Sequence, residues 1–237
     1  MVKLDYECTK CQKIYSDKEY KQNAYCPKCG IHLWQRSFSP TPFKVNDVFA
    51  EFTALNSFVV AEGIVYNNVN VWFNARNTVY EKFHKKLSAK KLTEGDKWLT
   101  DFRKYICFKG NQSWNFKRAG TEALAHPEEL KRLLLLLQDN KVPVDDRIRS
   151  CLQGDGTCPG VDRIFLTALL HMYWPSKYGV WGKHTDNALK KIKRTPIQQA
   201  DLGDHYTLIN KTLIKLASEL HTSLTAVDGF MWYIAKV

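Results

Sequence analysis

Residues 159–173 read PGVDRIFLTALLHMY, a tight turn followed by a densely apolar segment. The apolar segment, from Ile164 to Tyr173, predicts a helix. A shorter helix is predicted just upstream, so the turn lies between two helices in a helix-hairpin-helix. Such a turn presents backbone N–H groups at the N-terminus of the second helix, where a phosphate can bind. We therefore expect nucleic-acid contacts from the turn and the residue after it: Pro159, Gly160, Val161 and Arg163.

A wider stretch, residues 145–194, resembles the helix-hairpin-helix DNA glycosylase superfamily, the endonuclease III-like proteins. In that family a Pro-Gly-Val-Gly hairpin leads into a buried helix, and a Val-Asp-Thr-His segment opens the next helix at a fixed distance. Here the segment Val180-Trp181-Gly182-Lys183-His184 falls at that distance, and His184 matches the family's histidine. The resemblance implies a mainly α-helical domain of the glycosylase type with a role on DNA.

The chain departs from this family at the positions that carry the chemistry. Gly182 occupies the position of the catalytic aspartate, and Ile164 that of the lysine nucleophile of bifunctional members. Asp162 replaces the second hairpin glycine, where it can cap the helix that follows. Base excision needs a carboxylate to stabilise the developing sugar cation or an amine to attack it, and neither is in its place. We therefore expect DNA binding without conventional glycosylase catalysis.

One alternative keeps catalysis in an enzyme that excises or modifies bases. Asp186 lies one helical turn beyond Gly182, and with Lys183 and His184 it places an acid, an amine and an imidazole within four residues. In the competing interpretation Lys183 and His184 contact phosphate or solvent, and Asp186 balances the helix N-terminus. A base-sized pocket between the helix starting at Asp162 and the helix starting at His184 would favour the enzyme.

The N-terminus carries a second motif, the pairs Cys8-x-x-Cys11 and Cys26-x-x-Cys29. Four thiolates in two such knuckles can surround one Zn²⁺ tetrahedrally, and the spacing is typical of a structural zinc ribbon. Two disulfides or free thiols are the alternative. The metal site would be closed, so the Zn²⁺ would stabilise a small module for recognition, including docking of a protein partner, and would do no chemistry.

A proline-containing linker, residues 37–42, separates the two parts of the chain. We expect a zinc ribbon of two short β-hairpins over residues 1–38 and a helical domain over residues 39–237. Apolar residues recur at helical spacing over residues 45–60, 126–140 and 204–220, which predicts a helix in each range, and another helix is predicted to start at residue 145. Residues 63–73 alternate loosely, which fits either a short hairpin that turns at Asn67-Asn68 or a buried irregular segment, and the hairpin is slightly favoured.

The composition indicates an intracellular protein with no membrane partner. The chain has 237 residues, of which 44% are hydrophobic, and no apolar run reaches the roughly 18 residues that would span a bilayer. The first five residues are not an apolar signal segment, and we expect a cytoplasmic location. The remaining cysteines share no ligand-like spacing and fit reduced, buried thiols: Cys107, Cys151 and Cys158.

Positive charge is concentrated in two stretches of a chain whose net charge is +11. From Arg76 to Arg118 twelve basic residues face four acids, and from Lys183 to Arg194 five basic residues face one. Such concentration points to a polyanion, and we expect nucleic acid, most simply DNA. The alternative is a solvated basic face on a protein-interaction adaptor. The second stretch supplies the predicted phosphate contacts: Lys183, Lys190, Lys191, Lys193 and Arg194.

The last segment, residues 227–233 (VDGFMWY), resembles the end of diverged helix-hairpin-helix proteins encoded near restriction and DNA-modification systems. It favours a role in DNA modification or restriction.

Overall fold

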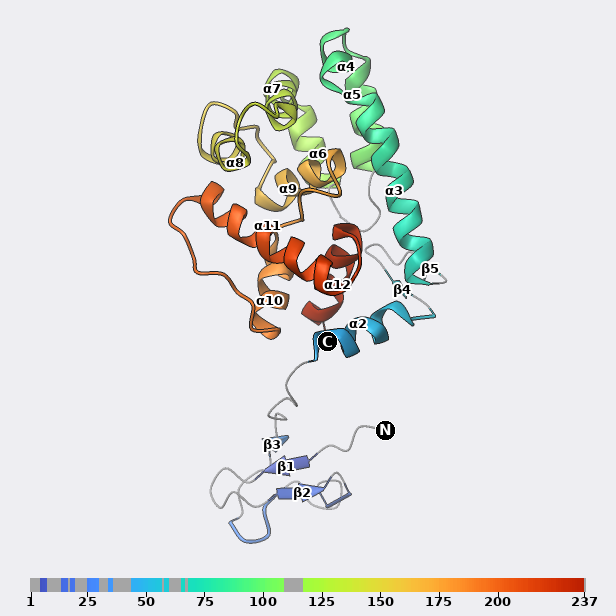
Figure 1. Cartoon of the computed structure of the whole chain (residues 1–237), viewed down its shortest axis with the longest axis vertical. Coiled ribbons are helices and arrows are strands. Elements are labelled where there is room, and N and C mark those ends of the chain that lie inside the picture. The colour runs from blue at the N-terminus through green and yellow to red at the C-terminus, as the bar shows by residue number, and fades with distance from the viewer. Residues whose placement is uncertain are drawn as a thin grey trace. The chain divides into compact units, whose positions relative to one another are not determined.

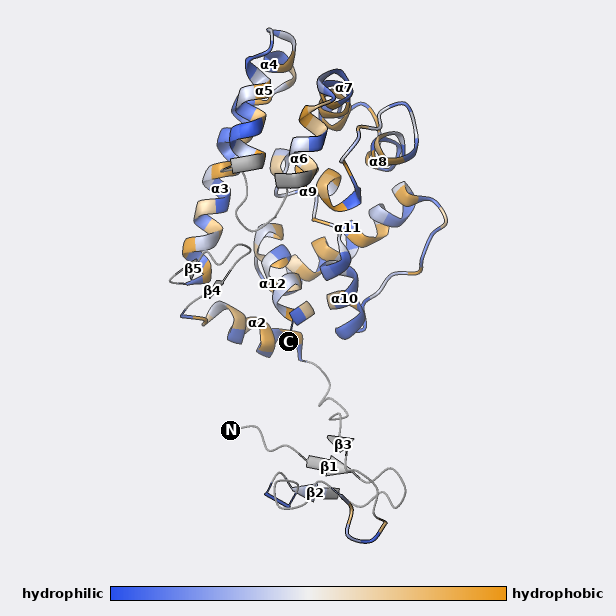
Figure 2. Ribbon diagram, turned by 180° about the vertical axis from the view of Figure 1, so that it is seen from behind, coloured by the Kyte–Doolittle hydropathy of each residue, from blue (hydrophilic) through white to orange (hydrophobic). Residues whose placement is uncertain are grey.

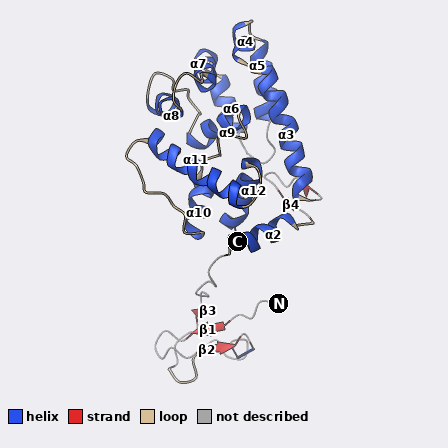
Figure 3. Ribbon diagram, in the orientation of Figure 1, coloured by secondary structure: helices blue, strands red, loops and turns tan. Residues whose placement is uncertain are grey.

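The computed structural model describes residues 5–7, 14–16, 18–19, 25–29, 34–35, 44–56, 58–59, 65–66, 68–108 and 117–236. The chain divides into two compact units, residues 1–44 and residues 45–237. The described residues are mainly helical, and their strands are short (Figure 3). The mainly helical class predicted from the sequence is therefore confirmed.

The N-terminal unit contains a small antiparallel sheet. Its central strand β1 (Asp5–Glu7) pairs with β2 (Ile14–Ser16) on one side and with β3 (Trp34–Gln35) on the other. Tyr6 lies opposite both Tyr15 and Gln35. Among the described residues, β1 and β2 form one hairpin and β3 pairs with the other edge of β1. The second of the two hairpins predicted from the sequence falls largely outside the described residues.

The larger unit is built from helices, with one two-stranded pairing between β4 (Phe58–Val59) and β5 (Val65–Tyr66) among its described residues (Figure 1). Its helical elements, in chain order, are α2 (Val45–Thr53), α3 (Val69–Lys86), α4 (Ala89–Thr93), α5 (Lys97–Phe102), the π-helix η2 (Arg103–Phe108), α6 (Lys117–Leu124), α7 (Pro127–Gln138), α8 (Val144–Gln153), α9 (Arg163–Tyr173), α10 (Lys183–Lys191), α11 (Leu202–Glu219) and α12 (Leu224–Lys236).

Helix α9 lies in the core of this unit. Residues 165–173 are all buried, and α3, α7 and α8 pack against the helix (Figure 1). A helix that is largely apolar and buried on most of its sides gains stability from that burial. The hairpin at its N-terminus is therefore attached to a helix of the core.

Helix α12 brings distant parts of the chain together. It packs against α10 and α11, which precede it, and also against α3 and α2 from the beginning of the unit. Helix α11 packs along α8 in turn. Side chains of α12 can therefore contact both the helix that follows Gly182 and a helix about 150 residues away in sequence.

Two predicted elements near the start of the unit differ from the structure. The helix predicted over 45–60 ends at Thr53, and Phe58 instead pairs with Tyr66 across the β4–β5 ladder. The hairpin turn predicted at Asn67-Asn68 is wrong. Asn68 is the N-cap of α3, and its side-chain oxygen accepts from the Val71 N–H at 2.9 Å. Asparagine favours turns and helix caps alike, and here the cap prevails.

Candidate nucleic-acid interface

The hairpin between α8 and α9 has the tight geometry that its sequence requires. Gly160 has φ +80°, a left-handed conformation that glycine adopts without steric cost. A Cβ at this position would lie 2.8 Å from both the Ala119 carbonyl oxygen and Glu122 Cβ. The hairpin backbone therefore packs directly against α6, while Pro159 at its tip stays exposed.

The N-terminus of α9 is capped by an acid from its own chain. The Asp162 carboxylate accepts from the Phe165 N–H at 2.8 Å, as the substitution of a glycine by aspartate suggested. One of the backbone N–H groups expected to bind a phosphate, that of Phe165, is thus already bonded to Asp162. The negative charge of Asp162 lies beside the remaining N–H groups at this helix end. An incoming phosphate would meet electrostatic repulsion at this helix end, so the hairpin is a weaker anion site than predicted.

Three side chains link the start of α9 to the start of α10. Arg163 lies 2.8 Å from one carboxylate oxygen of Asp186, and the Trp181 indole N–H donates to the other at 2.9 Å. The Arg163 guanidinium also lies over the Trp181 ring, 4.6 Å from its centroid. Arg163, predicted to bind DNA, and Asp186, predicted as a possible catalytic acid, are therefore partners of one another.

Gly182 and Ile164 lie in contact. Gly182 is buried at the N-cap of α10, and a Cβ built on it would lie only 2.5 Å from Ile164 Cδ1 and 3.2 Å from His184 Cε1. These are the two positions that the family resemblance assigns to the catalytic aspartate and lysine. In this chain the end of the Ile164 side chain occupies the space that a carboxylate at position 182 would enter, so the isoleucine would have to move to admit one.

His184 is directed toward a buried ion pair. Its Nε2 lies 3.3 Å from one oxygen of Asp228, whose other oxygen is 2.8 Å from the Arg76 guanidinium. Burial alone would raise the pKa of Asp228, but the adjacent Arg76 and His184 hold that pKa well below its usual range. Arg76 also donates to the Tyr80 hydroxyl at 2.7 Å. This network joins α3, α10 and α12.

His171, in the last turn of α9, is neutral, and both of its ring nitrogens are hydrogen-bonded. Its Nδ1 donates to the Tyr178 carbonyl at 2.5 Å, so its Nε2 accepts from the Thr225 hydroxyl 3.3 Å away. Burial lowers the pKa of His171 to about 4, with Arg76 adding to the effect. These contacts make it a structural residue of the core.

The basic residues after Gly182 divide into two groups. Lys191 donates to the Ile234 carbonyl at 3.1 Å near the end of α12, and Arg194 is paired with Glu219. Lys183, Lys190 and Lys193 are exposed, and within the described part of the chain they make no ion pair. Figure 2 shows α10 as a predominantly hydrophilic helix. Three of the five predicted phosphate ligands are thus available to a polyanion.

The first basic stretch is less uniform than its sequence suggested. Arg76 is buried, at 4% exposure, and belongs to the ion pair with Asp228. Lys90 and Lys91 lie 3.8 and 2.5 Å from the carboxylate of Glu94. The prediction that Arg76 contributes to a basic surface is wrong. Arg76 lies on the buried face of α3, where it pairs with Asp228.

The predicted zinc ligands are described in part. Cys8 and Cys11 lie outside the described residues. Cys26 is buried, and its sulfur is 3.1 Å from the Tyr15 hydroxyl. The Cys29 N–H donates to the Cys26 carbonyl at 3.2 Å, which closes a turn of the kind that a metal-binding knuckle needs. The second knuckle is therefore compatible with Zn²⁺.

The remaining cysteines of the helical unit fit inert thiols. Cys151 and Cys158 are buried, and burial raises the pKa of Cys158 to about 11. The side chain of Cys107 lies outside the described residues. A thiol that stays protonated is a poor nucleophile, so neither Cys151 nor Cys158 is suited to catalysis.

Comparison with known proteins adds no family to this picture. We found no matching protein-family model, no matching curated protein and no matching solved structure. Across the described residues, the helices are too short or too polar to cross a lipid bilayer. The case for a function therefore rests on the chain's own residues.

Sequence reasoning missed Asp228. It lies in the segment VDGFMWY, in which it is the only acid among apolar and aromatic residues. That isolation was the one sequence signal for a buried, paired carboxylate. A single acid in an otherwise buried helix needs a cationic partner, but the sequence did not indicate that the partner would be Arg76.

Proposed function

We propose that this protein binds DNA through its helical unit and does not excise bases by the glycosylase mechanism. The unit is a diverged helix-hairpin-helix domain whose role is recognition of modified or distorted DNA. The N-terminal unit holds a structural Zn²⁺ through Cys8, Cys11, Cys26 and Cys29. Affinity comes mainly from Lys and Arg contacts to phosphates and from the counterions that they release.

The contact between Gly182 and Ile164 carries the proposal. Two positions that are distant in sequence, and that the resemblance pairs in a catalytic site, lie side by side. The groups present there are a hydrogen atom and a saturated hydrocarbon chain, which can neither stabilise a sugar cation nor attack one. Asp186, the acid that the alternative enzyme would use, has both oxygens bonded to Arg163 and Trp181.

The exposed lysines of α10 support a polyanionic partner. Lys183 and Lys190 are seven residues apart, which is two helical turns, so they lie on the same face of the helix. Lys193 follows two residues after the helix ends. Their charges are not neutralised by acids within the described helical unit, so they provide a local positive field toward solvent.

The proposal is tested by fluorescence anisotropy with a labelled DNA duplex over a range of salt concentrations. We expect binding that weakens steeply with salt, with a log–log slope of about −0.9 for each phosphate neutralised. Replacing Lys183, Lys190 and Lys193 together by Glu should weaken binding to all sequences alike and make the slope shallower by about 2.7.

A matched control separates the interface from net charge. Lys141, Lys211 and Lys215 are exposed lysines outside both basic stretches, and replacing them by Glu changes the net charge equally. This control should retain most of the binding. Equal losses in the two triple variants, or no binding at about 50 mM salt, would contradict the proposal.

A further inference from the structure

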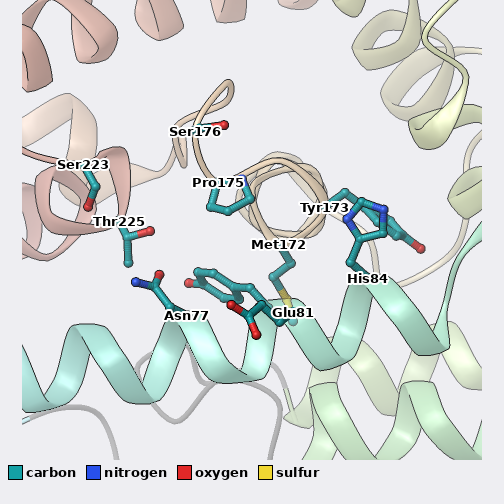
Figure 4. A pocket seen from close by; sticks show the side chains of 10 residues that line it. Asn77, Glu81, His84, Met172, Tyr173, Pro175, Ser176, Ser223 and Thr225 are labelled. Carbon is teal, nitrogen blue, oxygen red and sulfur yellow. The ribbon is translucent and has the colours of Figure 1, made fainter.

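A pocket of about 420 Å³ opens in the helical unit, away from the hairpin (Figure 4). It lies between α3, the C-terminal end of α9 and the start of α12, and it includes no residue of α10. An enzyme was expected to have its pocket between the starts of α9 and α10. The pocket described here lies elsewhere, and neither the hairpin residues nor Gly182 line it. Its lining residues are Asn77, Tyr80, Glu81, His84, Met172, Tyr173, Pro175, Ser176, Ser223 and Thr225.

The floor of this pocket is apolar, aromatic and fixed. Tyr80, Met172, Tyr173 and Thr225 are each no more than 2% exposed. The Tyr173 hydroxyl donates to the Leu87 carbonyl at 2.8 Å, and Thr225 is bonded to His171. Because hydrogen bonds to buried groups hold three of these four side chains, the floor is preformed. The volume is within the range of roughly 300–1,000 Å³ that is usual for small-molecule sites.

The rim of the pocket is polar, and of its three α3 residues His84 packs its ring edge-to-face against Tyr173 and Trp174. Asn77, Glu81 and His84 lie on successive turns of α3, on the side that Figure 4 shows facing Pro175. Asn77 and Glu81 make no hydrogen bond or ion pair with any residue that the structure describes. Their amide and carboxylate groups are therefore available to a ligand.

The charge of the pocket is opposite to that of the protein. The net charge of the chain is +11, yet among the described residues that line the pocket none is Lys or Arg, and Glu81 is the only carboxylate. Lys85, one turn beyond Glu81, neither lines the pocket nor comes within ion-pair distance of that carboxylate. An anionic ligand would be repelled by Glu81, whereas a cation would gain a charge-assisted hydrogen bond.

We propose that this pocket binds a small organic cation, an amidinium or guanidinium group carried on a flat apolar body. The body packs on the floor formed by Tyr80, Met172 and Tyr173. The cationic head donates two parallel N–H bonds to the Glu81 carboxylate, a geometry that planar amidinium groups favour. The side-chain carbonyl of Asn77 accepts a further N–H bond from the cationic head. The site is independent of DNA binding.

Three isosteric probes test the charge selectivity on the full chain: benzamidine, benzamide and benzoate. Ligand-observed NMR at about pH 8, where an ordinary imidazole is neutral, measures each affinity. We expect benzamidine to bind most tightly, benzamide at least about tenfold more weakly, and benzoate not at all. Equal binding of the three probes, or binding of none, would overturn the proposal.

Variants locate the binding in this pocket. Glu81→Gln should reduce benzamidine affinity at least about tenfold and abolish its advantage over benzamide. Glu51→Gln, an exposed acid on α2, removes the same charge elsewhere and should have no effect. Lys85→Gln should leave benzamidine binding intact or strengthen it. Ser176→Trp, at an exposed rim position, should block the mouth and abolish binding; benzamidine binding that survives it lies elsewhere and refutes the site.

Discussion

Adding a single methyl group at Gly182 tests how tightly this residue packs against Ile164. Gly182 has φ −145°, an extended conformation open to any residue, so Gly182→Ala introduces no backbone strain. Its new Cβ would start 2.5 Å from Ile164 Cδ1 and 2.9 Å from Ile164 Cγ1. Carbon atoms pack best at about 3.5–4.0 Å, so the isoleucine must move by roughly 1 Å. Overpacking of this kind costs about 1–3 kcal/mol.

Removing the obstructing side chain should relieve this cost. Ile164→Ala deletes the atoms that the new Cβ would meet, so the double variant should be more stable than the sum of the two single changes implies. We expect a coupling of at least about 1 kcal/mol, measured by urea unfolding followed by circular dichroism. Additive effects, or a Gly182→Ala variant as stable as the original, would refute the packing argument.

The same reasoning predicts that Gly182→Asp alone restores no excision, and that only its combination with Ile164→Ala provides space for the carboxylate.

Three further predictions concern stability. Burial lowers the pKa of His171 from 6.5 to about 4, so as the pH falls the unfolded chain takes up a proton on this imidazole before the folded chain does. The free energy of unfolding should therefore fall by about 3 kcal/mol between pH 6.5 and pH 4. Urea unfolding of His171→Gln should lack this part of the pH dependence. Asp228→Asn leaves Arg76 buried without its carboxylate and should cost about 3–5 kcal/mol, whereas Asp186→Asn, in an ion pair whose side chains are about 40% exposed, should cost no more than about 1 kcal/mol. Chelation of zinc, or Cys26→Ser, should unfold the N-terminal unit in an NMR spectrum while signals of the helical unit persist, and loss of both sets would be the contrary outcome.

Much of the helical framework could be predicted from the sequence. Local signals determine these elements, as in Pro127 at the first position of α7 with two acids after it. Gly160 has the left-handed conformation that a tight turn needs, and Asp162 caps α9. Each of these features depends on residues within one or two turns of the chain, so a linear pattern contains the necessary information.

The pairing of charges could not be predicted in the same way. Arg76 was counted with the basic residues around it, but its partner Asp228 is about 150 residues away and comes from the last helix. Lys191 and Arg194 belong to one basic run, yet Lys191 binds a carbonyl of α12 and Arg194 binds Glu219. Tertiary contacts decide which cations face solvent, and a charge count along the sequence contains no such contacts.

The pocket beside α3 also depends on tertiary structure. Asn77, Glu81 and His84 share a helix face, which the spacing alone indicates. Their proximity to Met172 and Thr225 follows only from the packing of α3, α9 and α12. A polar helix face opposite an apolar floor becomes visible as a site only when the three helices are assembled.

The central claim, DNA binding without base excision, is tested most directly by one assay on duplexes carrying a damaged base. The purified full chain is incubated with labelled DNA, and both released base and borohydride-trapped protein–DNA adduct are measured under conditions where anisotropy reports binding. The account predicts a bound duplex with no released base and no trapped adduct. Excision that persists in Asp186→Asn would contradict the claim that the glycosylase chemistry is lost. Excision abolished by that substitution would contradict it equally, and would assign the catalytic carboxylate to Asp186.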